Sequence, residues 1–166
     1  MSGQNFGNAL YGLKSMSSDS EEVRRFIRVT AKIMRNSTVE MTGQNIGNAL
    51  FGMQGMSESH EEIREILSCL AHKLMTSQSK LSGLDIGMSL YGLRSMESGS
   101  TEVAVLLGLL IHKVKSDPSL DMRLGELSLA IIGILQASPW IRDDFLETLA
   151  KKTSGMQYIV SGARTR

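Results

Sequence analysis

The sequence predicts an all-α fold, an α-solenoid of about four helix-turn-helix repeats with a 40-residue period. One string recurs at regular spacing, and the apolar residues within each copy follow the periodicity of an α-helix. Leucine and methionine outnumber aromatic residues, and Pro118 and Pro139 are the only prolines, so little in the composition opposes helix formation.

The chain contains an internal repeat. The string SGQNFGNALYGLKSM begins at Ser2, TGQNIGNALFGMQGM at Thr42 and SGLDIGMSLYGLRSM at Ser82, so the starts lie 40 residues apart (42 − 2 and 82 − 42). A degenerate fourth copy, AIIGI at 130–134, aligns with ALFGM at 49–53. We therefore expect one domain, 1–166, with repeats at about 2–41, 42–81, 82–121 and 122–152, and a C-terminal tail at 153–166.

Each copy contains two helical stretches. In the second copy Ile46, Ala49, Leu50 and Met53 fall at i, i+3, i+4 and i+7, the spacing of one helix face, and Thr42 stands where an N-cap is expected. Two helices in each copy, joined by short polar loops, cannot bury their apolar faces alone. Neighbouring copies must therefore stack into a continuous core.

The second helix of each copy carries a start signal. Ser59 with Glu62, and Asp19 with Glu22, have the spacing of a capping box. In the fourth copy Ser138 precedes Pro139, which predicts an N-cap followed by proline at the first helical position.

Glycines recur at two matched positions within the predicted first helices. A glycine inside a helix costs roughly 1 kcal/mol relative to alanine, so its recurrence indicates a packing requirement. We expect close approach of adjacent helices, with close approach of a ligand backbone as the alternative. The six glycines are Gly7, Gly47, Gly87, Gly12, Gly52 and Gly92.

Composition and motifs favour a binding protein over an enzyme. The net charge is +1, and no apolar run is long enough to cross a bilayer. Cys69 is the only cysteine, and with His72 it supplies two ligands, too few for a zinc site. Neither a phosphate-binding glycine loop with G-x-x-x-x-G-K-[ST] nor an H-E-x-x-H sequence is present. We expect no catalytic residues, no cofactor and no metal.

The first-helix string QNIGNALFGM at 44–53 resembles the core of the octotricopeptide and heptatricopeptide repeats, which are related to the repeats that accompany RAP domains. The resemblance covers the first helix of three copies. It implies two-helix units of about this length and a place among the nucleus-encoded organellar proteins of algae and protists. It also implies RNA binding in a mitochondrion, with a plastid as the alternative.

One predicted helix carries a cationic stripe. Arg25, Arg28, Lys32 and Arg35 fall at i, i+3, i+7 and i+10 in the first copy, and the matched residues of the second copy are not basic. Cations on one rigid helix face suit contact with successive phosphates of a nucleic acid. A solvated outer face is the alternative interpretation.

Matched polar positions on the first helices supply further candidates for RNA contact. Lys14, Gln54 and Arg94 form one series, and Asn48 belongs to a second with Asn8. Such residues are typical of repeat proteins that read one base per unit. Asn5, Asn45 and Asp85 also vary at one matched position. Aromatic residues recur at Tyr11, Phe51 and Tyr91, where packing between repeats is favoured over stacking on bases.

We therefore expect a non-catalytic RNA-binding protein of an organellar ribonucleoprotein, of which a mitochondrial ribosome with its rRNA is one candidate. A protein adaptor within a large organellar complex is the alternative, and the near-zero net charge favours it. Apolar residues already stand on the first predicted helix at Phe6, Leu10 and Leu13. For this reason we also expect other protein subunits to cover at least one end of the solenoid.

Overall fold

The computed structural model describes residues 1–152, and the predicted tail at 153–166 lies outside the described residues. Within the described range the secondary structure is helical, with no strand, so the all-α prediction is confirmed. The helices are α1 (Gly3–Tyr11), α2 (Glu21–Arg35), α3 (Gly43–Gly52), α4 (Glu61–Thr76), α5 (Gly83–Leu93), α6 (Thr101–Ser116), α7 (Leu124–Ile134) and α8 (Pro139–Ala150).

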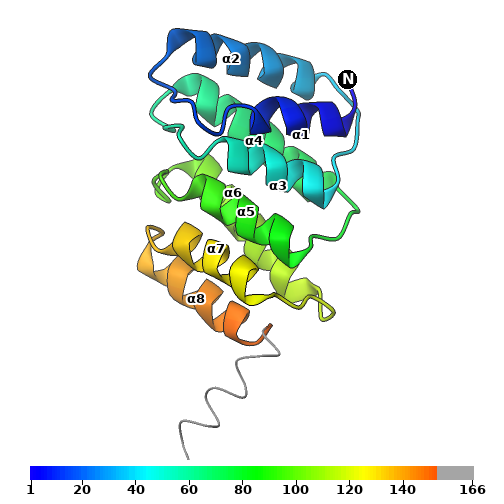
Figure 1. The fold of residues 1–166 in the computed structure, drawn as a ribbon, viewed down its shortest axis with the longest axis vertical. Coiled ribbons are helices and arrows are strands. Elements are labelled where there is room, and N and C mark those ends of the chain that lie inside the picture. Colours follow the sequence, from blue (N-terminus) through cyan, green and yellow to red (C-terminus); the bar gives the residue numbers. More distant parts are fainter. Residues whose placement is uncertain (153–166) are drawn as a thin grey trace, which may run out of the picture.

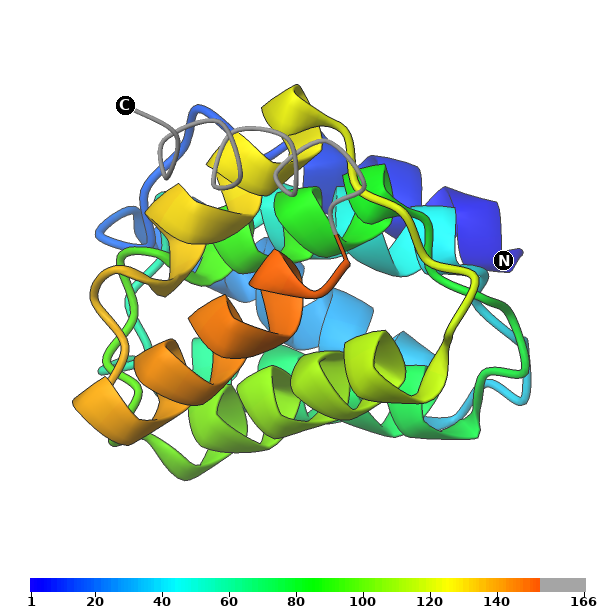
Figure 2. The ribbon, with the colours of Figure 1, turned by 90° about the horizontal axis from the view of Figure 1, so that it is seen from below.

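The helices form two parallel rows. The odd-numbered helices α1, α3, α5 and α7 pack side by side in one row, and α2, α4, α6 and α8 pack in the other (Figure 1). Seen from below in Figure 2, the two rows lie against each other as two layers. Successive helices are therefore antiparallel partners from different rows, and we refer to α1–α2, α3–α4, α5–α6 and α7–α8 as the first to fourth helix pairs.

The start of α3 matches the sequence prediction. Thr42 caps α3, accepting a hydrogen bond at Oγ1 from the backbone N–H of Asn45 (3.3 Å). The Asn45 side chain accepts in return from the Thr42 N–H (3.2 Å), which completes a capping box. Ser82 and Asp85 repeat this arrangement at the start of α5.

The starts of α2 and α4 differ from the prediction. The N-caps are Ser20 and His60, one residue after the predicted Asp19 and Ser59, so the capping boxes predicted there are wrong. The physical reason is a preceding turn that engages these residues. Ser59 exchanges a hydroxyl hydrogen bond with Ser57 (2.8 Å) and accepts at its carbonyl from Arg64 (2.9 Å). The start at Ser138 and Pro139 is confirmed.

Glycine allows the odd-numbered helices to pack backbone against backbone. A methyl group built at Gly7 would lie 2.8 Å from the Asn45 carbonyl oxygen, and one at Gly47 would lie 3.1 Å from that of Asp85. At Gly52 and Gly92 a methyl group would overlap the carbonyls of Leu10 and Leu50 in the preceding helix. Close helix packing is thus the role of these glycines. Gly12 is the exception, since a methyl there meets only backbone oxygens of its own helix.

Lysines connect the even-numbered row to the loops between helix pairs. Lys73 in α4 is buried and donates from Nζ to the carbonyl oxygens of Ser37 (2.6 Å) and Val39 (2.9 Å). Lys113 in α6 donates in the same way to Ser77 (2.9 Å), and Lys152 to Asp117. These bonds satisfy carbonyls in the loops that join one pair to the next.

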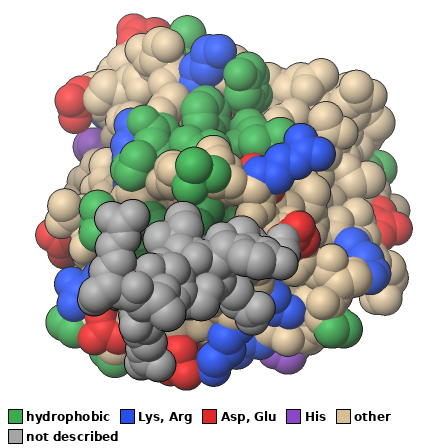
Figure 3. Space-filling view, turned by 60° about the horizontal axis from the view of Figure 1, so that its bottom comes forward, with side chains coloured by type: hydrophobic (Ala, Val, Ile, Leu, Met, Phe, Trp, Pro, Cys, Tyr) green, Lys and Arg blue, Asp and Glu red, His purple; other side chains and the backbone are tan. Residues whose placement is uncertain are grey.

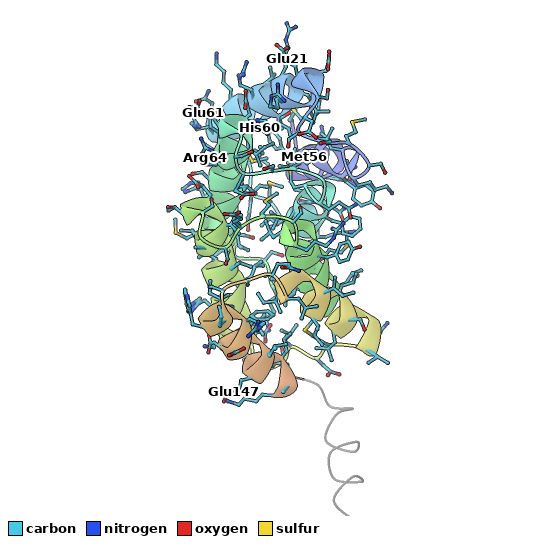
Figure 4. All side chains as sticks on the ribbon, turned by 90° about the vertical axis from the view of Figure 1, so that its left-hand side faces the viewer. Glu21, Met56, His60, Glu61, Arg64 and Glu147 are labelled. Carbon is cyan, nitrogen blue, oxygen red and sulfur yellow. The ribbon has the colours of Figure 1, made fainter. Side chains whose placement is uncertain are left out.

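One continuous apolar core runs through all of the pairs. Met56 lies between the two rows in the side view of Figure 4 and is 2 % exposed. Among the described residues no helix is long and apolar enough to cross a membrane.

Candidate functional site

The basic stripe lies on the exposed side of α2, but it is partly neutralised by α4. Arg28 forms an ion pair with Glu62, and Arg35 forms one with Glu65 (3.3 Å). These partners sit 34 and 30 residues away in sequence, and they are acidic residues of the next even-numbered helix. Half of the predicted phosphate-binding stripe therefore serves contacts between helix pairs.

Glu62 is held as a carboxylate. Its pKa is lowered first by a hydrogen bond from its own backbone N–H in the first turn of α4, and then by the Arg28 guanidinium. Because the pKa of Glu62 is lower in the folded state, the Arg28–Glu62 contact makes its full contribution to the stability of the fold at neutral pH. It is lost as the pH falls through that pKa.

Arg25 and Lys32 are exposed, and within residues 1–152 neither forms a hydrogen bond or an ion pair. They lie seven residues apart, about two helical turns, and therefore point to the same side of α2. These two side chains are the part of the stripe that is available to a phosphate.

The recurring aromatic residues form a ladder across the odd-numbered row. The rings of Tyr11 and Phe51 lie 5.8 Å apart, and those of Phe51 and Tyr91 lie 5.6 Å apart, each pair with an interplanar angle of 20°. Each ring is half-buried. Their faces are occupied by one another, which matches the prediction of packing between repeats and leaves little room for an inserted base.

Cations close both ends of the ladder. Lys14 Nζ lies 4.6 Å from the Tyr11 ring centre, and the Arg94 guanidinium lies 3.9 Å from that of Tyr91. Gln54, between them in the matched series, donates from its amide to the Lys14 carbonyl (2.8 Å). The structure brings these three predicted contact residues together along one line, each already holding an internal contact.

Asn48 lies on the same surface and is half-buried. Within the described range its side chain makes no hydrogen bond, so its amide is available to a ligand. Asn5, Asn45 and Asp85 have a different role, because each exchanges hydrogen bonds with the N-cap of its own helix. That series is structural.

Sequence reasoning missed the apolar end of this surface. The positions matched to Asn48, Phe51 and Gln54 in the fourth pair carry Leu129, Ile132 and Leu135, a step of 81 residues. We call these three residues the α7 patch.

The α7 patch is accessible and continues the ladder. Ile132 is 46 % exposed and Leu135 is 52 % exposed. Gly133 packs against the backbone of Leu90 and Tyr91, and Ile132 stands at the position matched to the rings of the ladder. Figure 3, with the lower end of the molecule tilted forward, shows hydrophobic side chains gathered on one face with Lys and Arg side chains at their border. The sequence carries a signal for this patch, because apolar Leu129 and Leu135 stand in the fourth copy where the second copy has Asn48 and Gln54.

The histidine, cysteine and acidic side chains of the described residues do not gather into a metal site. No group of three or more His, Cys, Asp or Glu side chains suited to a metal ion occurs among the residues that the structure describes. Cys69 is buried, and its Sγ contacts the Ala31 carbonyl oxygen at 3.7 Å.

Cys69 is expected to react slowly with thiol reagents in the native protein. Burial raises the pKa of its thiol, and the thiolate is the reactive form. Alkylation by iodoacetamide at pH 8 is expected to be at least tenfold slower in buffer than in 8 M urea. Equal rates in the two solutions would show that the packing of α4 against α2 opens readily.

Comparisons with protein-family models, curated proteins and solved structures return no match.

Proposed function

We propose that the chain is an α-solenoid of four units with a 40-residue period that acts as a non-catalytic protein adaptor, and that its odd-numbered row binds the partner. The observation that carries this proposal is the α7 patch, where exposed Leu135 stands at the position of Lys14, Gln54 and Arg94, and exposed Ile132 stands at the position of the ladder rings. Protein interfaces are centred on such apolar anchors within a polar rim.

The surface of the odd-numbered row changes from polar to apolar between the first and the fourth helix pair. One matched series runs Asn8, Asn48, Met88, Leu129, and another runs Lys14, Gln54, Arg94, Leu135. The fourth pair therefore supplies apolar contact area, and the first two supply hydrogen-bonding groups. A partner that lies along the row would bury the α7 patch and leave Lys14 and Asn48 near the wetter rim.

The adaptor proposal is tested by capture from an extract of the native cells. Immobilised wild-type protein is expected to retain a partner that Ile132→Glu and Leu135→Glu variants lose by tenfold or more, because each change buries a charge in the contact. Val105→Glu is the matched control, since Val105 is 47 % exposed but lies on α6 in the other row. Equal retention by all variants contradicts the proposal.

RNA binding is the second candidate, and the exposure of Arg25 and Lys32 favours it. The resemblance of the first helices to organellar RNA-binding repeats points the same way, toward rRNA or an organellar transcript in a mitochondrion or plastid. If the protein binds RNA, Arg25 and Lys32 hold phosphates. Asn48, Lys14 and Arg94 then make secondary contacts.

RNA binding is measured by fluorescence anisotropy with single-stranded RNA over a range of salt concentrations. If Arg25 and Lys32 hold phosphates, the variant Arg25→Ala, Lys32→Ala is expected to reduce the slope of log affinity against log salt by about 1.5. The variant Arg28→Ala, Arg35→Ala is the control, and its slope is expected to change less because Glu62 and Glu65 already neutralise these cations. Absence of binding at low salt excludes this candidate.

A further inference from the structure

The outer side of the first helix pair exposes residues at the positions that later pairs use for stacking. Met16 is 50 % exposed, whereas the matched Met56 is 2 % exposed. Phe26 is 42 % exposed against 0 % for Ile66, and Val29 is 53 % exposed against 8 % for Cys69. We call the exposed set the end face; its members are Met1, Met16, Phe26, Val29 and Ile33.

One substituted and one retained residue adapt the end face to an apolar neighbour. Ile33 stands where Lys73 and Lys113 donate to the carbonyls of a preceding loop. Gly12 stands where Gly52 and Gly92 admit the backbone of a preceding helix, and no other segment of the described chain comes near it. The first pair thus retains, at Gly12, the glycine that permits close approach of another helix. At position 33 it has isoleucine in place of the lysine that binds a preceding loop.

The opposite end of the stack does not fit this face. Ser128 occupies the position of Gly7, Gly47 and Gly87, and its side chain would meet backbone there. Glu22 is matched to Glu62, which pairs with Arg28, but the fourth-pair residue matched to Arg28 is Glu147. Figure 4 shows Glu147 at the end of the molecule away from Glu21. A head-to-tail stack would therefore oppose two carboxylates.

We propose that the end face binds the end face of a second copy of this chain about a two-fold axis, with the two α2 helices antiparallel. The charges on α2 suit this arrangement, since its first turn carries Glu21 and Glu22 and its last turn carries Lys32 and Arg35. Antiparallel packing sets the acidic turn of each copy beside the basic turn of the other. The apolar stripe Phe26, Val29 and Ile33 meets its own copy, as a two-fold interface requires.

This dimer goes beyond the proposed adaptor function, and it uses a different surface. The α7 patch lies on the pair farthest from the end face along the stack (Figure 1). Dimer formation leaves the α7 patch open in both copies and so doubles the number of partner sites.

The first test is the mass of the full chain in solution by sedimentation equilibrium and light scattering over a wide concentration range. We expect a dimer for the wild type, a monomer for Val29→Glu and a dimer for the control Val105→Glu, because Val29 is on the end face and Val105 is not. Circular dichroism of Val29→Glu is expected to match the wild type, since the side chain is exposed in the single chain. A wild-type monomer at all concentrations, or a dimer that survives Val29→Glu, overturns the proposal.

Charge reversal tests the antiparallel arrangement. Glu22→Lys and Lys32→Glu are each expected to weaken the dimer by tenfold or more, and the double variant is expected to recover most of the loss because the opposed pairs are restored with their signs exchanged. Additive weakening in the double variant overturns the antiparallel arrangement. If the wild type is monomeric but partner capture still depends on Ile132 and Leu135, this proposal fails and the adaptor function stands.

Discussion

Alanine in place of Gly92 is expected to destabilise the protein by about 3 kcal/mol, the upper part of the range for overpacked interiors. The added methyl group would overlap the Leu50 carbonyl, which is backbone of the neighbouring helix and cannot turn aside as a side chain would. Urea denaturation followed by circular dichroism measures the loss. A fall in Tm of roughly 10 °C is expected with it.

Gly108 in α6 is the matched control for this change. It also lies within a helix, but no atom of another segment approaches a methyl group built there. Gly108→Ala is therefore expected to stabilise the protein by about 0.5–1 kcal/mol, the helix-propensity difference alone. If both variants change the free energy of unfolding in the same direction, close backbone packing is not the reason for glycine at position 92.

Methionine in place of Lys73 is expected to cost about 2 kcal/mol. The ammonium group donates two hydrogen bonds to the carbonyls of Ser37 and Val39, and hydrogen bonds from charged donors contribute about 1.5–3 kcal/mol. Methionine retains most of the apolar stem, so the change removes chiefly the hydrogen bonds and the charge. Urea denaturation at neutral pH measures the difference.

Arg25→Met provides the comparison for Lys73. Arg25 is exposed and contributes no hydrogen bond within residues 1–152, so its replacement is expected to change stability by less than about 0.5 kcal/mol. Similar losses in the two variants would indicate an effect of net charge, and the loop contacts of Lys73 would then carry little of the stability.

Local sequence patterns predicted the helices well. The start at Thr42 was readable because the cap and its partner lie three residues apart, and the start at Ser138 because a proline follows the cap directly. The start of α4 was misplaced by one residue because Ser59 is engaged by Ser57 and by Arg64, and the spacing of a capping box does not show such competition.

The candidate surfaces were harder to predict, because they depend on contacts between distant residues. The pairing of Arg28 with Glu62 joins positions 34 residues apart, and it follows from the register of α2 against α4 rather than from either helix alone. The α7 patch was missed for another reason. The repeat period of the fourth copy predicts its helices but not the polarity of its surface, which changes where Leu135 stands at the position of Gln54.

The aromatic ladder and the single tryptophan report on different ends of the molecule. Tyr11 and Tyr91 stack through Phe51 across the first three helix pairs, so the tyrosine band of the near-ultraviolet circular dichroism follows that region. Trp140 lies on α8 in the fourth pair and is 73 % exposed, so the anisotropy of its fluorescence, which depends on whether α8 is folded, follows the other end. Stacked helix pairs contact only their neighbours, and their ends therefore open independently when the seams between pairs are weak. Two optical signals from unlabelled protein thus distinguish unfolding from one end from cooperative melting of the whole stack.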